Sequence, residues 1–231
     1  MTTRAAVLGA LAGVRDPELD EPLTELGFVG AVAVDGADVH VDLRLPTFFC
    51  APSFVYLMVA DAHAALARLP GVGAVTVEVG DHFAGEQIAT AVAGDDGFAA
   101  AFPGEAAGEP DLLRTRFRRK ALVARQARLA ETLLARGCAL DDLRALTLSR
   151  LPPGPDRDRC RTLRAELGLP CGPHDPAFVR PDGGTLADAG ELERFLRVAR
   201  LVRVSLEGNG GFCRGLLRTR YGVPDRERRA A

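Results

Sequence analysis

One cysteine stands where a thiol could do chemistry. Cys50 ends a short loop that follows alternating apolar and polar residues and precedes a long apolar stretch starting near Pro52. The alternation predicts a strand and the apolar stretch a helix, so the thiol is expected just before a helix N-terminus. Negative charge is favoured there, which biases a thiol towards the thiolate that binds metal or attacks an electrophile. The alternative is a small buried hydrophobe.

Two carboxylates and a histidine are further candidates. Asp16 and Glu18 flank Pro17 in a turn, because proline disfavours helix for the residue before it. The carboxylates could bind a metal or a partner, or the turn could simply cap the preceding helix. His82 follows the third expected strand, where it is either a metal ligand or a structural residue.

The other cysteines form no recognised pattern. The chain has five, at irregular spacings and without a C-x-x-C pair, which argues against a disulfide framework and a four-cysteine zinc site and favours a reducing cytoplasm. Cys213 follows a glycine-rich run at 208–211. We expect a turn over 205–211 and a new helix over 212–221, which would put Cys213 at a helix start, as for Cys50. Packing against Phe212 and Leu216 is the alternative.

The elements that must position these residues fall into two parts. The patterns predict a helix at 3–13, strands at 28–34 and 39–45 joined by a turn at Asp35-Gly36, a helix at 51–69 and a strand at 72–79. This is an α/β (α+β) sandwich of helix, strand, strand, helix and strand. We therefore expect a first domain over 1–93, a linker rich in Gly, Ala, Glu and Pro over 94–110, and a mostly helical second domain over 111–231.

Composition and motifs narrow the functional classes. The formal net charge is −2, which gives no global reason to expect nucleic acid as a partner. We find no secretory signal and no apolar run of ~18 residues that would suggest a membrane span. No Walker loop, G-x-G-x-x-G, H-E-x-x-H or G-x-S-x-G motif occurs, so we expect no enzyme. An enzyme with a nucleophilic cysteine would need a positioned base, and no such base is evident.

Four short segments, in order, resemble the SufT/PaaD-like iron–sulfur cluster assembly domain, an FSCA-like domain. They are Val14–Leu19 with its Asp-Pro-Glu turn, Leu26–Val29, the pair Thr47 and Cys50, and Leu69–Val72 before the last strand. The resemblance stops near residue 82. The family usually places a proline directly after the cysteine, whereas here Ala51 intervenes, which changes how the thiol is presented.

The resemblance implies an accessory protein of iron–sulfur or other metallocofactor assembly, acting as a carrier or adaptor through Cys50. It implies that Cys50, Thr47, Asp16 and Glu18 contact iron or a transient cluster. Clusters generally need about four ligands. We therefore expect Cys213 and His82 to join Cys50 as metal ligands, or a client or second copy of the chain to supply the rest.

The expected partners are a client metalloenzyme, such as an oxygenase, and the iron–sulfur assembly machinery. A homodimer is a further option, and the helical second domain would select the client. The alternative function is a non-metal subunit or folding chaperone of an oxygenase or hydrolase complex. In that case the first domain would be only a binding surface.

Overall fold

The computed structural model describes residues 2–103 and 110–222, and the chain forms two compact units. The first comprises Met1–Leu113 together with Asn209–Ala231, and the second comprises Arg114–Gly208. The expected domain boundaries remain a prediction, and residues 104–109 of the expected linker lie outside the described residues. Among the described helices, none combines the length and apolar character needed to cross a membrane.

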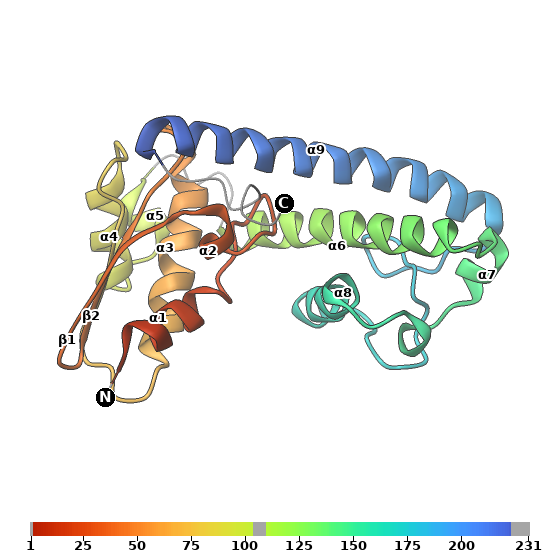
Figure 1. The fold of residues 1–231 in the computed structure, drawn as a ribbon, viewed down its shortest axis with the longest axis horizontal. Helices are drawn as coiled ribbons and strands as arrows, with labels where there is room; N and C mark the ends of the chain where they lie inside the picture. Colours follow the sequence, from red (N-terminus) through yellow and green to blue (C-terminus); the bar gives the residue numbers. More distant parts are fainter. Residues whose placement is uncertain (1, 104–109, 223–231) are drawn as a thin grey trace. The chain divides into compact units, whose positions relative to one another are not determined.

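The first unit has the predicted order of helix, strand, strand, helix and strand (Figure 1). Three short helices that the sequence patterns did not predict are added to it. In chain order the elements are α1 (Arg4–Leu11), α2 (Leu23–Leu26), β1 (Val29–Asp35), β2 (Asp38–Leu43), α3 (Pro52–Ala67), β3 (Val75–Glu78), α4 (Gly85–Ala93) and α5 (Phe98–Ala101).

The three strands form one sheet in the order β1-β2-β3. Strands β1 and β2 are antiparallel, with Asp35 opposite Asp38, and Gly36 takes the positive φ of +60° that the tight turn between them requires. Strands β2 and β3 are parallel, in register from Val39 opposite Val75 onward. Because parallel strands end at the same edge, the loops after β2 and β3 begin side by side.

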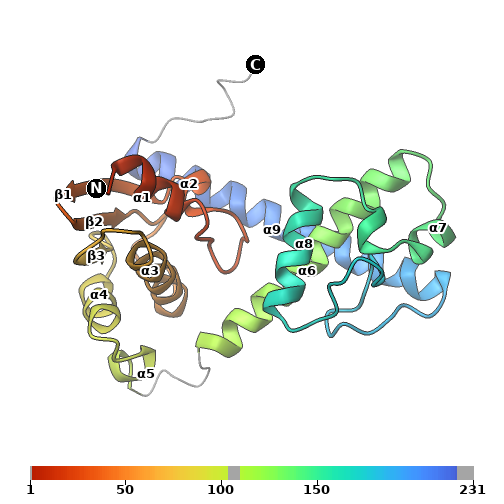
Figure 2. The same ribbon diagram turned by 90° about the horizontal axis from the view of Figure 1, so that it is seen from below.

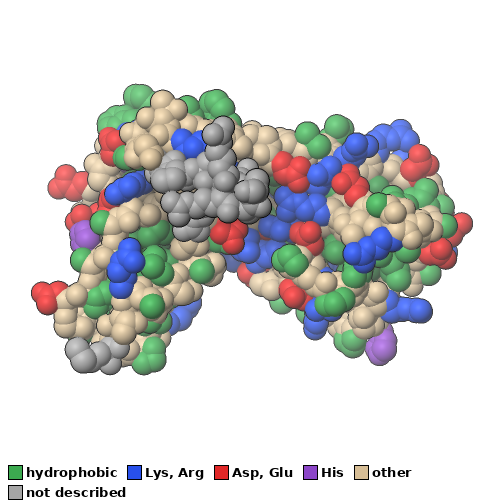
Figure 3. Space-filling model, viewed as in Figure 1, with side chains coloured by type: hydrophobic (Ala, Val, Ile, Leu, Met, Phe, Trp, Pro, Cys, Tyr) green, Lys and Arg blue, Asp and Glu red, His purple; other side chains and the backbone are tan. Residues whose placement is uncertain are grey.

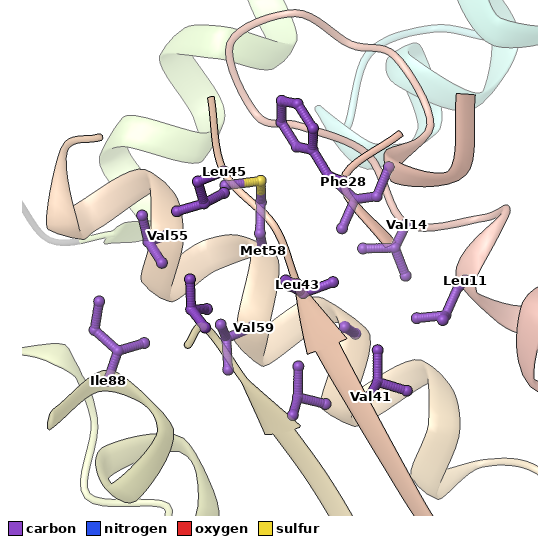
Figure 4. Close-up of a cluster of buried hydrophobic side chains, with 14 of the residues drawn as sticks. Leu11, Val14, Phe28, Val41, Leu43, Leu45, Val55, Met58, Val59 and Ile88 are labelled. Atoms are coloured by element: carbon purple, nitrogen blue, oxygen red, sulfur yellow. The ribbon is translucent and has the colours of Figure 1, made fainter. Parts of the chain in front are cut away.

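A single apolar core joins the sheet to α3. Alternate β2 residues are buried, and Val55, Met58 and Val59 of α3 belong to the same cluster of side chains (Figure 4). Ile88 of α4 and Phe98 of α5 extend the same core. Helices α1, α3 and α4 lie beside the sheet in both ribbon views (Figures 1 and 2). The loops at the carboxyl edge of the sheet therefore rest on a packed base.

The second unit is mostly helical, as predicted. It contains most of α6 (Pro110–Ala135), α7 (Leu140–Ala145), a 3-10 turn at Leu148–Arg150, α8 (Pro155–Glu166) and the first part of α9 (Ala189–Tyr221). Basic and acidic side chains lie next to one another over this unit (Figure 3). They include ion pairs between Arg125 and Asp156 at 2.8 Å and between Arg203 and Glu131 at 3.0 Å.

A buried arginine organises the loops of the second unit. The Arg164 side chain is fully buried and donates to the carbonyl oxygens of Pro176, at 2.8 Å, and Ala177, at 2.7 Å. Burial lowers its pKa from the ordinary value. In the same loops, Val179 and Thr185 form an isolated antiparallel bridge.

The turn expected at 205–211 is wrong. Helix α9 continues without a break from Ala189 to Tyr221 (Figure 1). Each helical glycine costs about 1 kcal/mol relative to alanine, but tertiary packing can override such a preference. Here Leu206 and Leu217 are buried on either side of the glycine-rich run, and Arg214 is ion-paired with Glu21. Cys213 therefore lies inside a helix and not at its start.

The start of α4 depends on the absence of a side chain at Gly85. A Cβ atom at Gly85 would overlap the backbone carbonyl oxygen of Val79. We predict that Gly85→Ala lowers the free energy of unfolding by about 1–3 kcal/mol. The matched control is Gly211→Ala in α9, where a Cβ atom meets nothing within 4 Å. It should leave stability unchanged or raise it by up to about 1 kcal/mol. Urea unfolding followed by circular dichroism measures both, and equal stability of the two variants would contradict this account.

Candidate functional site

Cys50 lies in the loop after β2, with the Thr47 side chain beside its sulfur. The Thr47 Oγ1 atom is 3.4 Å from the Cys50 Sγ atom, and it also accepts a hydrogen bond from the Phe49 backbone N–H at 3.3 Å. Because that contact uses an oxygen lone pair, the hydroxyl hydrogen can be donated to the sulfur. Thr47 therefore orients the thiol.

The inserted alanine takes a defined place in front of α3. Ala51 is the capping residue of the helix, in a non-helical conformation, and Pro52 is the first helical residue. No side chain caps this helix start. The thiol of Cys50 thus lies one residue before the cap, which confirms the expected position next to a helix N-terminus. Proline is favoured at the first helical position because it has no N–H to leave unpaired.

His82 holds the backbone of Cys50. Its Nδ1 atom accepts from the Ala84 N–H at 3.2 Å, so the hydrogen must be on Nε2, which donates to the Cys50 carbonyl oxygen at 2.7 Å. The ring is buried. Both nitrogens are engaged, so His82 would have to give up one of these bonds to bind a metal. The geometry gives it a positioning role.

Asp16 closes the turn that it shares with Glu18. Its Oδ1 atom accepts hydrogen bonds from the backbone N–H groups of Glu18, at 2.9 Å, and Leu19, at 2.8 Å. The side chain is buried, and burial raises its pKa to about 6, although the two hydrogen bonds act in the opposite direction. Asp16 thus has a capping role and is also a carboxylate held in a place that disfavours its charge.

Cys213 of α9 is an electrostatic neighbour of Cys50, Asp16 and Glu18. Its side chain is half-buried, and burial raises its pKa to about 11. The nearby charges of Asp16, Cys50 and Glu18 act in the same direction, while Arg214 opposes them. The setting expected for Cys213 was therefore wrong, because an interior helical position lacks the favourable dipole and the thiolate is disfavoured. The location is nonetheless informative, since Cys213 has both Cys50 and the Asp16 turn as electrostatic neighbours.

The last turns of α9 are attached to the first unit at several points. Leu217 is buried in its core, and Asn209 Nδ2 lies 3.4 Å from Glu18 Oε1. Arg220 donates to the carbonyl oxygens of Leu45, at 3.2 Å, and Asp81, at 3.0 Å, which follow β2 and β3. These anchors were not predicted from the sequence. The helical spacing of Cys213, Leu217 and Tyr221 was the signal that could have revealed a buried face.

Three phenylalanines form an exposed surface beside Cys50, here called the phenylalanine platform. Phe48, Phe49 and Phe83 are 41%, 79% and 53% exposed, and their ring centroids lie 5.1–6.2 Å apart. Phe83 follows His82, and its N–H donates to the Phe48 carbonyl oxygen at 3.4 Å. The platform is therefore tied to the same backbone contacts that hold Cys50.

The site contains the thiols of Cys50 and Cys213 and the buried carboxyl group of Asp16. The hydroxyl group of Thr47 lies next to the Cys50 sulfur. Thiolates are ligands for soft metals and iron–sulfur clusters. Within the described part of the chain, no group of three or more His, Cys, Asp or Glu side chains is placed to hold a metal ion. All six residues proposed from the sequence nevertheless belong to one neighbourhood, linked through Cys50 and Cys213.

Comparison with known proteins gives matches to the N-terminal part of the chain. Residues 4–79 match the family described as iron–sulfur cluster assembly protein. An iron–sulfur cluster carrier protein of Synechocystis sp. (strain ATCC 27184 / PCC 6803 / Kazusa) is 40% identical over 79 residues, which are 34% of this chain. The chain covers only 22% of that relative's length. No solved structure matches.

Asp16, Glu18, Thr47 and Cys50 lie within the matched stretch, whereas His82 and Cys213 lie beyond it. The match covers the helix, hairpin, long helix and third strand that build the sheet and its carboxyl edge. Residues 4–79 of this chain are therefore an FSCA-like domain of the iron–sulfur cluster assembly family.

Proposed function

We propose that this protein is a carrier that holds iron or an iron–sulfur cluster in transit at Cys50 and delivers it to a client metalloenzyme. The observation that carries the proposal is the Cys50 thiol within the assembly domain, oriented by Thr47 and held through its carbonyl by His82. The relative named as an iron–sulfur cluster carrier supports the same role. No catalytic turnover is required of the chain.

The cargo would be held by an incomplete set of ligands. Cys50 is the principal ligand and Cys213 the second thiol, with Asp16 and Glu18 on the adjacent turn. Thr47 and His82 are positioning residues. A cluster needs about four ligands, so the remainder would come from the client, the assembly machinery or a second copy of the chain. An open ligand set suits a carrier, because ligand exchange with the client can begin without unfolding the site.

The electrostatics of the site favour temporary binding. Burial keeps Cys213 protonated and raises the pKa of Asp16 to about 6. A bound cation would reverse both preferences and release protons, so its affinity should rise with pH. Near neutral pH a proton on Cys213 would still compete with a bound cation, whereas Asp16 is mostly ionised there.

The phenylalanine platform is the proposed docking surface for the client. Aromatic side chains, phenylalanine among them, are enriched in the cores of protein interfaces. Phe48 and Phe49 belong to the loop that presents Cys50, and Phe83 lies against them. The second unit would then contribute to the choice of client. The free thiols are consistent with a reducing compartment, which we propose to be the cytoplasm.

The first prediction of the proposed function concerns the loading of iron onto the protein. After anaerobic reconstitution with ferrous iron and sulfide, Cys50→Ser should retain iron only at background, because a hydroxyl is a poor ligand for soft metals. Cys213→Ser should retain less than the wild type, and Cys138→Ser, in the second unit, should equal it. Metal and sulfide analysis gives the readout. Equal iron in Cys50→Ser and wild type would exclude Cys50. A wild type without iron that is still required for client activity would favour the adaptor or chaperone alternative.

The second prediction concerns Asp16→Asn, which keeps the hydrogen-bond acceptor and removes the charge. A folded-state pKa of about 6, against an ordinary 3.8, means that wild-type stability falls as pH rises through this range. The variant should therefore gain stability relative to wild type between pH ~4 and ~7, by up to about 3 kcal/mol. Urea unfolding at several pH values measures this difference. A stable variant with reduced iron loading supports a role in cargo binding, whereas normal loading would limit Asp16 to capping the turn.

The third prediction separates delivery from loading. Phe49→Ser should leave iron loading unchanged and reduce cofactor content of the client in a strain that carries only the variant. The Phe49 side chain is 79% exposed, so its loss should hardly affect folding. The matched control is Leu112→Ser, which removes a side chain 65% exposed at the start of α6. If both variants mature the client as the wild type does, the platform is not the docking surface.

A further inference from the structure

The second unit contains a groove unrelated to the cysteines. It has a volume of about 510 Å³ and lies between α6, the loop at 180–186 and the first part of α9. All its lining residues belong to Arg114–Gly208. Its apolar lining includes Val123, Leu186, Phe195, Val198 and Val202.

The apolar wall of the groove is a continuation of the core. Val123 is buried and packs with Ala127 and Ala199. The half-buried side chains of Phe195 and Val202 lie against this cluster. Val198 is 58% exposed although it points an aliphatic side chain at the groove. An exposed aliphatic residue continuous with a buried cluster offers a ready surface for an apolar ligand group.

The charged lining is mostly basic. Four cations, from Arg119, Lys120, Arg180 and Arg194, face one carboxylate, Glu191. Glu191 is already neutralised, because it is ion-paired with Arg180 at 3.2 Å and accepts from the Ala187 N–H at 2.7 Å. These contacts hold the pKa of Glu191 below its ordinary value, so it stays anionic and bound to Arg180.

Two of the cations have charge to offer a ligand. In the described ranges of the chain, no carboxylate forms an ion pair with Arg119 or Arg194, which come from α6 and α9 on different sides of the groove. Lys120 lies over the Phe117 ring, 5.7 Å from its centroid. Guanidinium groups match carboxylates and phosphates through paired hydrogen bonds. The groove therefore combines an apolar wall with unpaired positive charge at its rim.

We propose that this groove binds a small amphiphilic anion, namely an apolar chain or ring that bears a carboxylate or phosphate. The volume is within the range of small-molecule sites, which are mainly apolar with a few placed polar groups. An uncharged apolar ligand would leave the rim cations unused, and a small inorganic anion would leave the apolar wall exposed to water. The proposal is independent of the cargo site, which is built from other residues.

The test uses the full-length protein and decanoate below its micelle concentration as the probe. Titration calorimetry should show saturable binding of one decanoate per chain, and amide signals of Val123, Val198 and Val202 should shift in nuclear magnetic resonance spectra. Decanol, which lacks the charge, and acetate, which lacks the chain, should each bind at least about tenfold more weakly. Equal binding of decanol, or no saturable binding of decanoate, would overturn the proposal.

Variants then test the residues. The double change Arg119→Gln with Arg194→Gln should weaken decanoate binding about tenfold or more, and Val198→Glu should abolish it. The matched control is Arg136→Gln with Arg150→Gln, which removes the same charge from exposed arginines outside the groove and should leave binding unchanged. A similar loss in the control would reduce the effect to net charge. Binding only to vesicles of anionic phospholipid, without monomeric decanoate, would also overturn the proposal and indicate a membrane surface.

Discussion

The candidate site depends on one hydrogen bond, from the His82 ring to the Cys50 carbonyl oxygen. It joins the loop after β2 to the loop after β3, and these loops meet because the two strands are parallel. The Ala84 N–H fixes which ring nitrogen donates, so the contact has a defined direction. The Phe83 N–H adds a second bond between the two loops, to the Phe48 carbonyl oxygen, and Arg220 binds the Leu45 carbonyl oxygen at the start of the segment. Thr47 orients the sulfur, and the phenylalanine platform takes its shape from the same two loops.

Against this fixed edge, the structure places two acids where their anions are disfavoured. Asp16 is buried in its own turn, and Cys213 is half-buried beside it, with Cys50 and Glu18 adding repulsion. The folded environment therefore disfavours negative charge on Asp16 and Cys213. A bound cation would stabilise that same negative charge. An asparagine at position 16 could accept the same two hydrogen bonds without this penalty. This arrangement is the one expected if, as proposed, the site binds a cation in exchange for protons.

Much of the first unit could be predicted from local pattern. Alternation in 39–45 and the Asp35-Gly36 turn indicated the hairpin, and Pro52 indicated the start of α3. The burial of Asp16 could not be predicted, because Asp-Pro-Glu has the composition of an exposed turn. The glycines of 208–211 indicated a break, yet the helix continues because contacts with residues such as Glu18, 191 positions away, stabilise it. Contacts at that separation leave no periodic signal, so Cys213 was placed near Cys50 for the wrong reason.

The site as a whole exceeds the domain that the family comparison identifies. Residues 4–79 supply the sheet, the thiol of Cys50 and the carboxylate turn, but His82 lies just past that stretch and Cys213 far past it. The final turns of α9 bring Cys213 to the domain, with Arg214 paired to Glu21 and Arg220 bound to the backbone at the ends of both parallel strands. The second thiol thus comes from a helix outside the matched domain, and Leu217, Arg214 and Arg220 hold that helix to the domain. In the proposed carrier role, Cys50 at the carboxyl edge of the sheet would receive the cargo, and Cys213 on this helix would complete or release its ligand set.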